Sequence, residues 1–398
     1  MAQNVSSPYS ILGIGDIESN DYGRYSASGS AAVSRREPGY YNFSNPASLT
    51  AIPYKTINFD FGFRGRISKF KVPGVDTLTA PSKDFIVKRA TLAFKVTPSV
   101  AFAFGIKPFS SINYKYQLDG TATGGGAELT KYTDGSGGMY QTYFSIAKQI
   151  KKRLSIGATA SWLFGSSQST VEYYNPLLSL DVIRNTNNYY NGPGLQLGLQ
   201  YFTLPGKKWQ QTIGITGSAY TTLKGKNTTN YTESSTTIKT LDPTDIKFKM
   251  PVTGSIGYSI ANKYGLSLHL QGTYNKWPMQ KLDYFNSYTK DAVSFNAGME
   301  YSKRITTPDY VVEKYYVGWG VRIEQSYLSI NNSRLNDYAI TFGGGKNLSR
   351  LLSISGGLEV GKRGASSLNQ IQENYTQINV GLTIKDLWFG HKRFGRFN

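Results

Sequence analysis

The sequence predicts an all-β protein: a closed antiparallel transmembrane β-barrel of about 14 strands, with an N-terminal plug segment in its lumen. Three observations lead to this prediction. Apolar and polar residues alternate with a period of two along most of the chain, and the links between these segments are alternately tight and long. The composition is also rich in Tyr, Phe and Gly, with 30, 20 and 42 of 398 residues. Such a composition favours strands and turns.

The alternating segments are predicted to form the barrel wall. In VAFAFGIK, residues 100–107, every second residue is Val, Phe or Ile, and those between them are Ala, Gly or Lys. Backbone groups in hydrocarbon must all be paired, so only a closed sheet can span the bilayer. We therefore expect the Leu, Ile, Val and Phe rows to face lipid and the Gly, Ser, Thr and Asn rows to face the lumen. Strands are expected to begin near residues 55, 85, 99, 139, 153, 185, 209, 244, 265, 293, 315, 336, 351 and 374.

The links distinguish a membrane barrel from a soluble sandwich. After every second segment the link is tight, as at Thr97-Pro98 and Lys151-Lys152. Short turns at one end and long loops at the other are typical of outer-membrane barrels. A soluble sandwich would also alternate, but its apolar face would not repeat for about ten residues in every strand. The long polar loops are expected at 73–84, 119–138, 175–184, 225–243, 281–292 and 364–373.

The net charge of +19 and the N-terminus bear on location and partners. Many cations fall in the tight turns, which fits a rim facing anionic lipid headgroups better than nucleic-acid binding. The first residues, MAQNVSSPYS, have no signal-peptide pattern. Either the protein is cytosolic or this is a mature chain with a start Met added. The barrel pattern favours the second, and we expect the chain in the outer membrane of a Gram-negative bacterium. The expected partners are outer-membrane lipid, a hydrophobic small molecule or detergent, and outer-membrane or periplasmic proteins, without nucleic acid.

The segment before the first strand is predicted to plug the barrel. It is rich in Gly, Ser, Ala and Asn and could not fold alone, whereas a barrel of about 14 strands is too wide for its own side chains to fill. We expect residues 1–54 to form this plug, called the hatch below, and 55–390 the barrel. Residues 391–398 would be a basic periplasmic tail. Asn45, Pro46 and Ala47 would carry the chain from the lumen to the wall.

At these residues the sequence resembles the FadL-like family of outer-membrane transporters for hydrophobic compounds. GSAAVSRREPGYYNFSNPASLTAI has the form of that family's hatch, which ends in Asn-Pro-Ala before the first of 14 strands. SPYSILGIGD and LTIKDLWF with the basic tail resemble the Bacteroidota branch. One departure is that Trp388-Phe389, the terminal aromatic run, is followed by nine more residues.

The resemblance implies passive uptake of hydrophobic small molecules through an extracellular loop groove, the hatch and a lateral gap in the wall. The Bacteroidota branch supplies an alternative, because such barrels occur there as accessory components: a non-transporting subunit of a secretion or protein-assembly complex. The loop groove would be formed by an apolar set that could equally pack on neighbouring loops: Leu177, Leu178, Leu180, Val182 and Ile183.

The predicted lateral gap lies in the third strand. Pro108 removes a ladder donor there, and Gly105 lacks a side chain that could seal an opening. A plain bulge is the alternative reading of this proline. The family's lateral gap also involves its third strand.

Catalysis is not expected. The chain has no Cys and two His, and it shows no nucleophile, metal or cofactor motif. We therefore expect no enzyme activity, and ion pairs that line the wall and hold the hatch. The polar residues expected in the lumen are Asp60, Arg64, Lys95, Lys107, His269, Glu300, Arg322, Glu324 and Glu359. The aromatic residues expected in the interfacial girdles are Trp162, Trp209, Trp277, Trp388 and Phe389.

Overall fold

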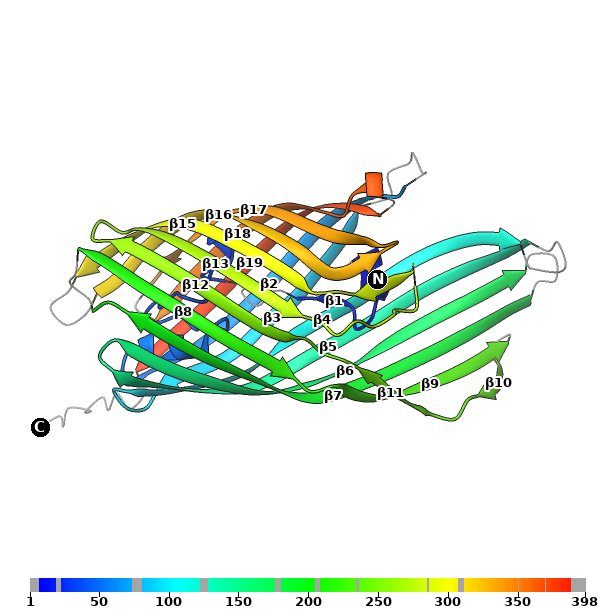
Figure 1. Ribbon diagram of the computed structural model, residues 1–398, viewed down its shortest axis with the longest axis horizontal. Coiled ribbons are helices and arrows are strands. Elements are labelled where there is room, and N and C mark those ends of the chain that lie inside the picture. The colour runs from blue at the N-terminus through cyan, green and yellow to red at the C-terminus, as the bar shows by residue number, and fades with distance from the viewer. Residues whose placement is uncertain are drawn as a thin grey trace, which may run out of the picture.

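The wall of the barrel is one antiparallel sheet that closes where its last strand, β19, pairs with its first, β2 (Figure 1). This computed structural model describes residues 7–18, 23–73, 81–121, 128–175, 180–204, 208–233, 236–284, 286–306, 311–349, 351–368 and 370–387. The strands are β2 (Thr56–Lys71), β3 (Ser82–Lys95), β4 (Val100–Thr121), β5 (Glu128–Lys151), β6 (Leu154–Asn175), β7 (Leu180–Phe202), β8 (Trp209–Tyr220), β9 (Leu223–Glu233), β10 (Thr236–Thr240), β11 (Thr244–Phe248), β12 (Val252–Asn262), β13 (Leu266–Lys276), β14 (Ser287–Thr289), β15 (Ala292–Thr306), β16 (Val311–Ile330), β17 (Ser333–Asn347), β18 (Leu352–Arg363) and β19 (Gln372–Leu387).

Several of these strands are pieces of one wall strand. β8 and β9 pair with successive parts of β7. β10 and β11 pair with β9, and β12 pairs with β8, so these three are pieces of the next wall strand. β14 and β15 both pair with β16 and are pieces of another. Counted so, the described residues form a closed barrel of 14 strands. The predicted fold class is therefore confirmed.

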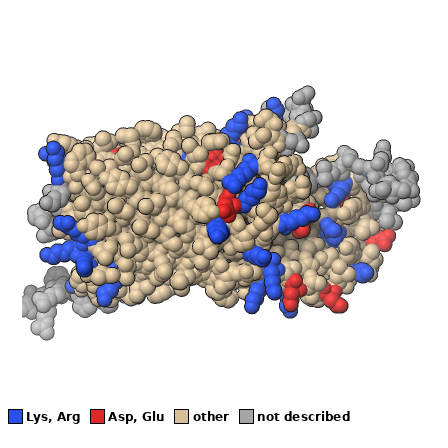
Figure 2. All heavy atoms as spheres, in the orientation of Figure 1, with Lys and Arg blue, Asp and Glu red and all other residues tan. Residues whose placement is uncertain are grey.

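The outer face carries a belt of exposed apolar side chains, which is the surface that alternation with a period of two produces in every strand. Leu197, Ile256 and Phe342 are 55%, 58% and 58% exposed. On the face in Figure 2 the charged residues gather at one end and again from about the middle of the molecule toward the other, and the surface between these two groups is almost free of them. Contiguous apolar surface of this extent, flanked by polar residues, is typical of a membrane-facing wall. In the described parts of the chain, no helix is long and apolar enough to cross a membrane.

The wall is much taller on one side than on the other. β4 to β7 contain 22 to 24 residues each, and β9, β10 and β11 continue the projecting side, whereas β13 and β18 contain 11 and 12 residues. At about 3.3 Å per residue the long strands extend roughly 75 Å, although about ten tilted residues suffice to cross a bilayer. They continue past the rest of the barrel at the long-loop end (Figure 1).

This projecting sheet corrects the predicted loops. Much of 119–138 belongs to β5, and most of 225–243 belongs to β9 and β10. Residues 180–184 belong to β7, where Val182 pairs with Tyr173 and with Glu233. Outside the bilayer both faces of a strand are polar, so the alternation that marks a wall strand disappears from the sequence although the pairing continues.

The hatch lies inside the barrel in short pieces: η1 (Pro8–Ile11), β1 (Asp16–Ile17), η2 (Ser26–Ser28) and η3 (Pro46–Ala51). η3 is the predicted turn. Asn45 caps it by accepting a hydrogen bond from the Ala47 N–H at 3.0 Å, and Pro46 occupies its first position. A Cβ on Gly198 in β7 would lie 2.2 Å from Asn45 Oδ1, so the wall needs glycine where this turn approaches it. One further turn, η4 (Ser366–Leu368), lies outside the lumen at the long-loop end.

Candidate functional site: the plugged lumen

The hatch is anchored toward the tight-turn end by arginines buried against wall carboxylates. Both terminal nitrogens of Arg24 donate to Glu300, at 2.6 and 2.5 Å, and one of them also donates to Glu313 at 2.7 Å. The Arg24 guanidinium lies 3.3 Å from the centre of the Tyr316 ring. Such bidentate, charge-assisted bonds are strong and fix geometry.

The same carboxylate serves a second arginine. Arg35 donates to Glu300 at 2.8 Å and to Glu37, within the hatch, at 3.1 Å. Burial would raise the pKa of Glu37, but Arg24, Arg35 and Arg304 outweigh it and hold this pKa below its usual value. Arg24, Arg35, Glu37, Glu300 and Glu313 form one network, called the charged core below. Removing Glu300, which bonds to both arginines, would leave buried positive charge without its nearest partner.

A second set of contacts holds the hatch where two wall strands part. The ladder between β3 and β4 ends at the pair Ala90–Ile106. Beyond it, the hatch strand β1 pairs with Ser110 and Ser111 of β4, and β4 bulges against β5 between Pro108 and Ser110. A short piece of the hatch thus takes the place of β3 beside β4.

Glu18 connects the hatch strand β1 to the wall strands on both sides of the break in the β3–β4 ladder. Its backbone N–H donates to the Phe109 carbonyl at 2.9 Å, and its carboxylate accepts from Ser111 Oγ at 2.8 Å. The carboxylate also accepts from Arg64 of β2 at 3.2 Å and from Lys88 of β3. Glu18 therefore links the hatch to the strands on either side of the place where the ladder stops.

Toward the long-loop end the lumen is filled by apolar side chains. Leu12 and Ile14 of the hatch are buried in a cluster with wall residues such as Trp277 and Tyr327, whose rings stack with centroids 4.4 Å apart. This set, called the apolar plug below, comprises Tyr9, Ile11, Leu12, Ile14, Phe109, Ile112, Tyr114, Met139, Leu163, Leu223, Phe248, Met250, Trp277, Leu282, Ala292, Tyr327, Leu328, Ile330 and Leu335.

The place of Trp277 corrects the predicted girdle. Its side chain is 6% exposed and lies inside the barrel, whereas Trp162 and Trp209 are 47% and 48% exposed on the outer wall. Trp277 directly follows β13, and it continues the row of that strand that faces the lumen, since Thr273 and Asn275 line the same cavity. The alternation of β13 therefore already places it inside.

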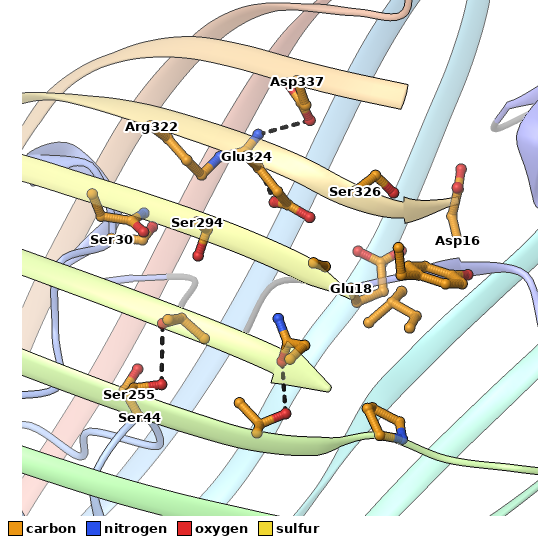
Figure 3. Close-up of a pocket in the computed structure, with 18 of the residues that line it drawn as sticks. Asp16, Glu18, Ser30, Ser44, Ser255, Ser294, Arg322, Glu324, Ser326 and Asp337 are labelled. Carbon is orange, nitrogen blue, oxygen red and sulfur yellow. Dashed lines mark hydrogen bonds and ion pairs between the residues drawn. The ribbon is translucent and has the colours of Figure 1, made fainter. Parts of the chain in front are cut away.

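Between the charged core and the apolar plug lies a cavity of about 300 Å³ with polar walls (Figure 3). On one side Arg322 donates to Glu324, Asp337 and Glu359, at 2.8, 3.1 and 2.7 Å. On the opposite side hydroxyl groups bond to one another, as Thr273 does to Ser255 at 3.0 Å. The cavity presents paired charges and hydroxyls, which suit water or a polar solute better than a hydrocarbon.

The remaining lumenal residues named from the sequence also contact the hatch or their wall neighbours. Asp60 accepts from Arg89 at 2.8 Å. Lys95 donates to the Thr50 carbonyl at 2.6 Å, and the Lys107 ammonium lies 3.8 Å from the centre of the Phe43 ring. His269 lies between Ser259 and Ser267, at 2.8 and 3.0 Å.

Some predicted features fall elsewhere. Val182 and Ile183 lie in β7 and not in a loop. Leu177, Leu178, Trp388, Phe389 and the tail 391–398 lie outside the described residues, and the side chain of Leu180 is not described. Gly105 is tightly packed in the wall, since a Cβ there would lie 2.4 Å from the Ala90 carbonyl oxygen.

The hatch cations and Glu18 were missed by sequence reasoning. Their one signal is charge within a segment of small residues, as in SRRE at 34–37. Among the described residues no group of three His, Cys, Asp or Glu side chains could hold a metal ion.

The chain matches one family model, and it is similar in fold to several solved structures. The family model described as BamG matches residues 1–395. No curated protein matches the chain. Among solved structures, a Pseudomonas aeruginosa FadL homologue has a TM-score of 0.60 at 12% identity and covers 92% of this chain and 99% of its own.

Two solved toluene transporters are similar to the same extent. TodX of Pseudomonas putida has a TM-score of 0.57 at 16% identity, covering 93% of this chain and 99% of its own. TbuX of Ralstonia pickettii has a TM-score of 0.55 at 15% identity, covering 92% and 98%. At such identities the likeness establishes the fold, which is that of FadL-like barrels.

Proposed function

The chain belongs to the BamG family, and from this premise we propose that it is an outer-membrane barrel of FadL-like fold that acts as an accessory, non-transporting subunit of a secretion or protein-assembly complex. The observation that carries the proposal is the filling of the lumen. The hatch closes it with the charged core toward one end and with the apolar plug toward the other.

A hydrophobic solute would meet an unfavourable path through this lumen. It would have to displace packed side chains of the apolar plug and then cross a cavity lined by Arg322 and its three carboxylates. Moving apolar groups past buried ion pairs removes polar contacts without replacing them. A filled lumen instead gives a stable cylinder whose outer wall and projecting sheet are available to partners.

Passive uptake of hydrophobic molecules is the second candidate, and one observation favours it. The β3–β4 ladder stops at Ala90–Ile106, beside Pro108, and the hatch fills the place of the missing pairs. A lateral opening there would need the hatch to move. The toluene transporters share this fold, and the apolar residues near 177–183 would then be the first place for ligand to bind.

Two measurements on the full chain separate the candidates. The first is affinity purification of the tagged protein from native outer membranes in mild detergent, with quantification of co-purifying proteins. The accessory role predicts a partner at fixed stoichiometry. Recovery of the barrel alone, at its native expression level, would contradict it.

The second measurement is toluene entry into vesicles that contain the barrel. The accessory role predicts no entry above that of protein-free vesicles, for the wild type and for Pro108→Val alike. Entry that Pro108→Val abolishes, while heat-modifiable migration on gels shows a folded barrel, would establish uptake through the wall near β4 instead.

A further inference from the structure

A cleft on the outer wall lies at the edge of the apolar belt, away from the lumen. It has a volume of about 260 Å³ and is formed by the long-loop ends of β17 and β18 together with the η4 turn. Its walls are Arg334, Asn336, Tyr338, Lys362, Leu368 and Gln370, with Gly364 and Ala365. The cleft belongs to neither the hatch nor the cavity in Figure 3.

The strand register fixes the height of the cleft relative to the belt. Toward the long-loop end, the outward pairs of β17 and β18 are Phe342–Leu358, then Ile340–Val360, then Tyr338–Lys362. The first two pairs are wholly apolar, and Ile340 is 66% exposed. The third brings a phenol and an ammonium group. The cleft therefore begins where the wall leaves hydrocarbon and meets the headgroup region.

Two cations line the cleft. Among the described residues neither Arg334 nor Lys362 forms an ion pair. Arg334 is half-buried and donates to Gln325 Oε1 at 2.5 Å, which holds its guanidinium at the wall, and Lys362 is exposed. The carboxylate of Asp291 accepts hydrogen bonds from the Tyr274 hydroxyl and the Trp277 N–H, and it interacts electrostatically with Arg334 without forming an ion pair with it.

The rim of the cleft is held in shape by a buried amide. Gln370, 2% exposed, donates from Nε2 to the carbonyls of Ser333 and Arg334, at 3.1 and 3.2 Å. The Leu368 N–H donates to the Ala365 carbonyl at 3.0 Å, closing the η4 turn. Leu368 is 46% exposed beside the cations. The cleft thus combines fixed donors with an apolar rim directly above the lipid-facing wall.

We propose that this cleft binds the phosphate of an anionic membrane lipid in the leaflet at the long-loop end. Arg334 and Lys362 contact the phosphate, Tyr338 and Leu368 lie against the glycerol or sugar part of the headgroup, and the acyl chains follow the Ile340–Val360 row. A guanidinium suits a phosphate because its donors match the oxygen geometry, and an ammonium adds a point charge. Lipid, and not soluble phosphate, is the source, because the cleft opens onto the hydrocarbon-facing wall.

Native mass spectrometry of the full chain, titrated in detergent with phosphatidylglycerol or phosphatidylcholine, tests this site. We expect the wild type to retain phosphatidylglycerol in preference, and Arg334→Gln/Lys362→Gln to bind it at least tenfold more weakly. The matched control is Lys69→Gln/Lys71→Gln, because Lys69 shares a register row with Lys362 through Asn374 but does not line the cleft. This control should bind like the wild type.

Three results would overturn the proposal: equal retention of the two lipids, undiminished phosphatidylglycerol binding by the cleft variant, or an equal loss in the control. A competition arm addresses the source of the phosphate. Displacement of phosphatidylglycerol by inorganic phosphate at equal concentration would make this a site for a soluble anion. Retention against a large excess of inorganic phosphate supports the lipid. Heat-modifiable migration shows that each variant is folded.

Discussion

The charged core and the apolar plug hold the same hatch by opposite physical means. In the charged core, Glu300 accepts from both Arg24 and Arg35, so the hatch is fixed by a few directional bonds between buried charges. In the apolar plug, Leu12 and Ile14 are held by many weak contacts without direction. Loss of one charge affects every partner at once, whereas loss of one apolar side chain leaves a local void. The hatch therefore has one rigidly specified end and one that tolerates change.

The largest effect is expected at the centre of the charged core. Glu300→Ala leaves Arg24 and Arg35 buried beside each other without their shared carboxylate, which should cost about 3–5 kcal/mol. Urea unfolding of the barrel in lipid vesicles measures this free energy. Glu324→Gln, at a partly exposed carboxylate of the cavity, is the control and should cost far less. A similar cost for the two variants would show that the charged core is not specially sensitive.

The apolar plug should respond less to a single truncation. Leu12→Ala removes a fully buried side chain and should lower the free energy of unfolding by about 2–4 kcal/mol. The same unfolding measurement applies, with Leu368→Ala as the exposed control. A loss larger than that of Glu300→Ala would reverse the comparison between the two regions.

A smaller effect than in either region is expected at the turn that joins hatch and wall. Asn45→Ala removes the η3 cap and the bonds that Asn45 Nδ2 donates to the Val33 and Leu199 carbonyls. A lost cap costs about 1 kcal/mol, within a range of about 0.5–2. Asn45→Ser keeps a capping oxygen and should recover part of this loss. Equal unfolding free energies for the two variants would mean that the cap contributes nothing.

The smallest effect is expected at the solvent-facing edge of the charged core. Arg304 lies 3.3 Å from Glu37, and its side chain is 37% exposed. Water screens such a pair, so Arg304→Gln should change the free energy of unfolding by less than about 1 kcal/mol. A loss comparable with that of Glu300→Ala would extend the rigid part of the network out to the rim.

The wall could be predicted from the sequence because a lipid-facing strand must show an apolar residue at every second position. The start of β2 near residue 55 and that of β13 near 265 follow from this rule. The projecting part of β5, from Glu128 to about residue 138, could not be predicted, since Thr, Gly, Ser and Asp occupy both of its faces outside the bilayer. There the pairing partner, and not the periodicity, defines the strand.

For the interior, the sequence predicts that a plug is present but not which residues pair within it. Small residues and Asn45-Pro46-Ala47 indicate a plug, but the pairing of Arg24 with Glu300 joins residues 276 positions apart and follows from the closed geometry. Trp277 is a different case, because the alternation of β13 already places it in the lumen with Thr273 and Asn275, whereas an aromatic residue at a strand end alone suggested a girdle.

Because the wall is unequal in height, the barrel presents two different sides to neighbours in the plane of the membrane. β4 to β7 stand well above the bilayer, while the strands on the opposite side, β17 to β19, contain 12 to 16 residues. A neighbouring membrane protein with a bulky domain above the bilayer would collide with the projecting sheet on the first side and would have free approach on the second. Lateral association is thereby restricted in direction by shape alone, before any specific contact forms.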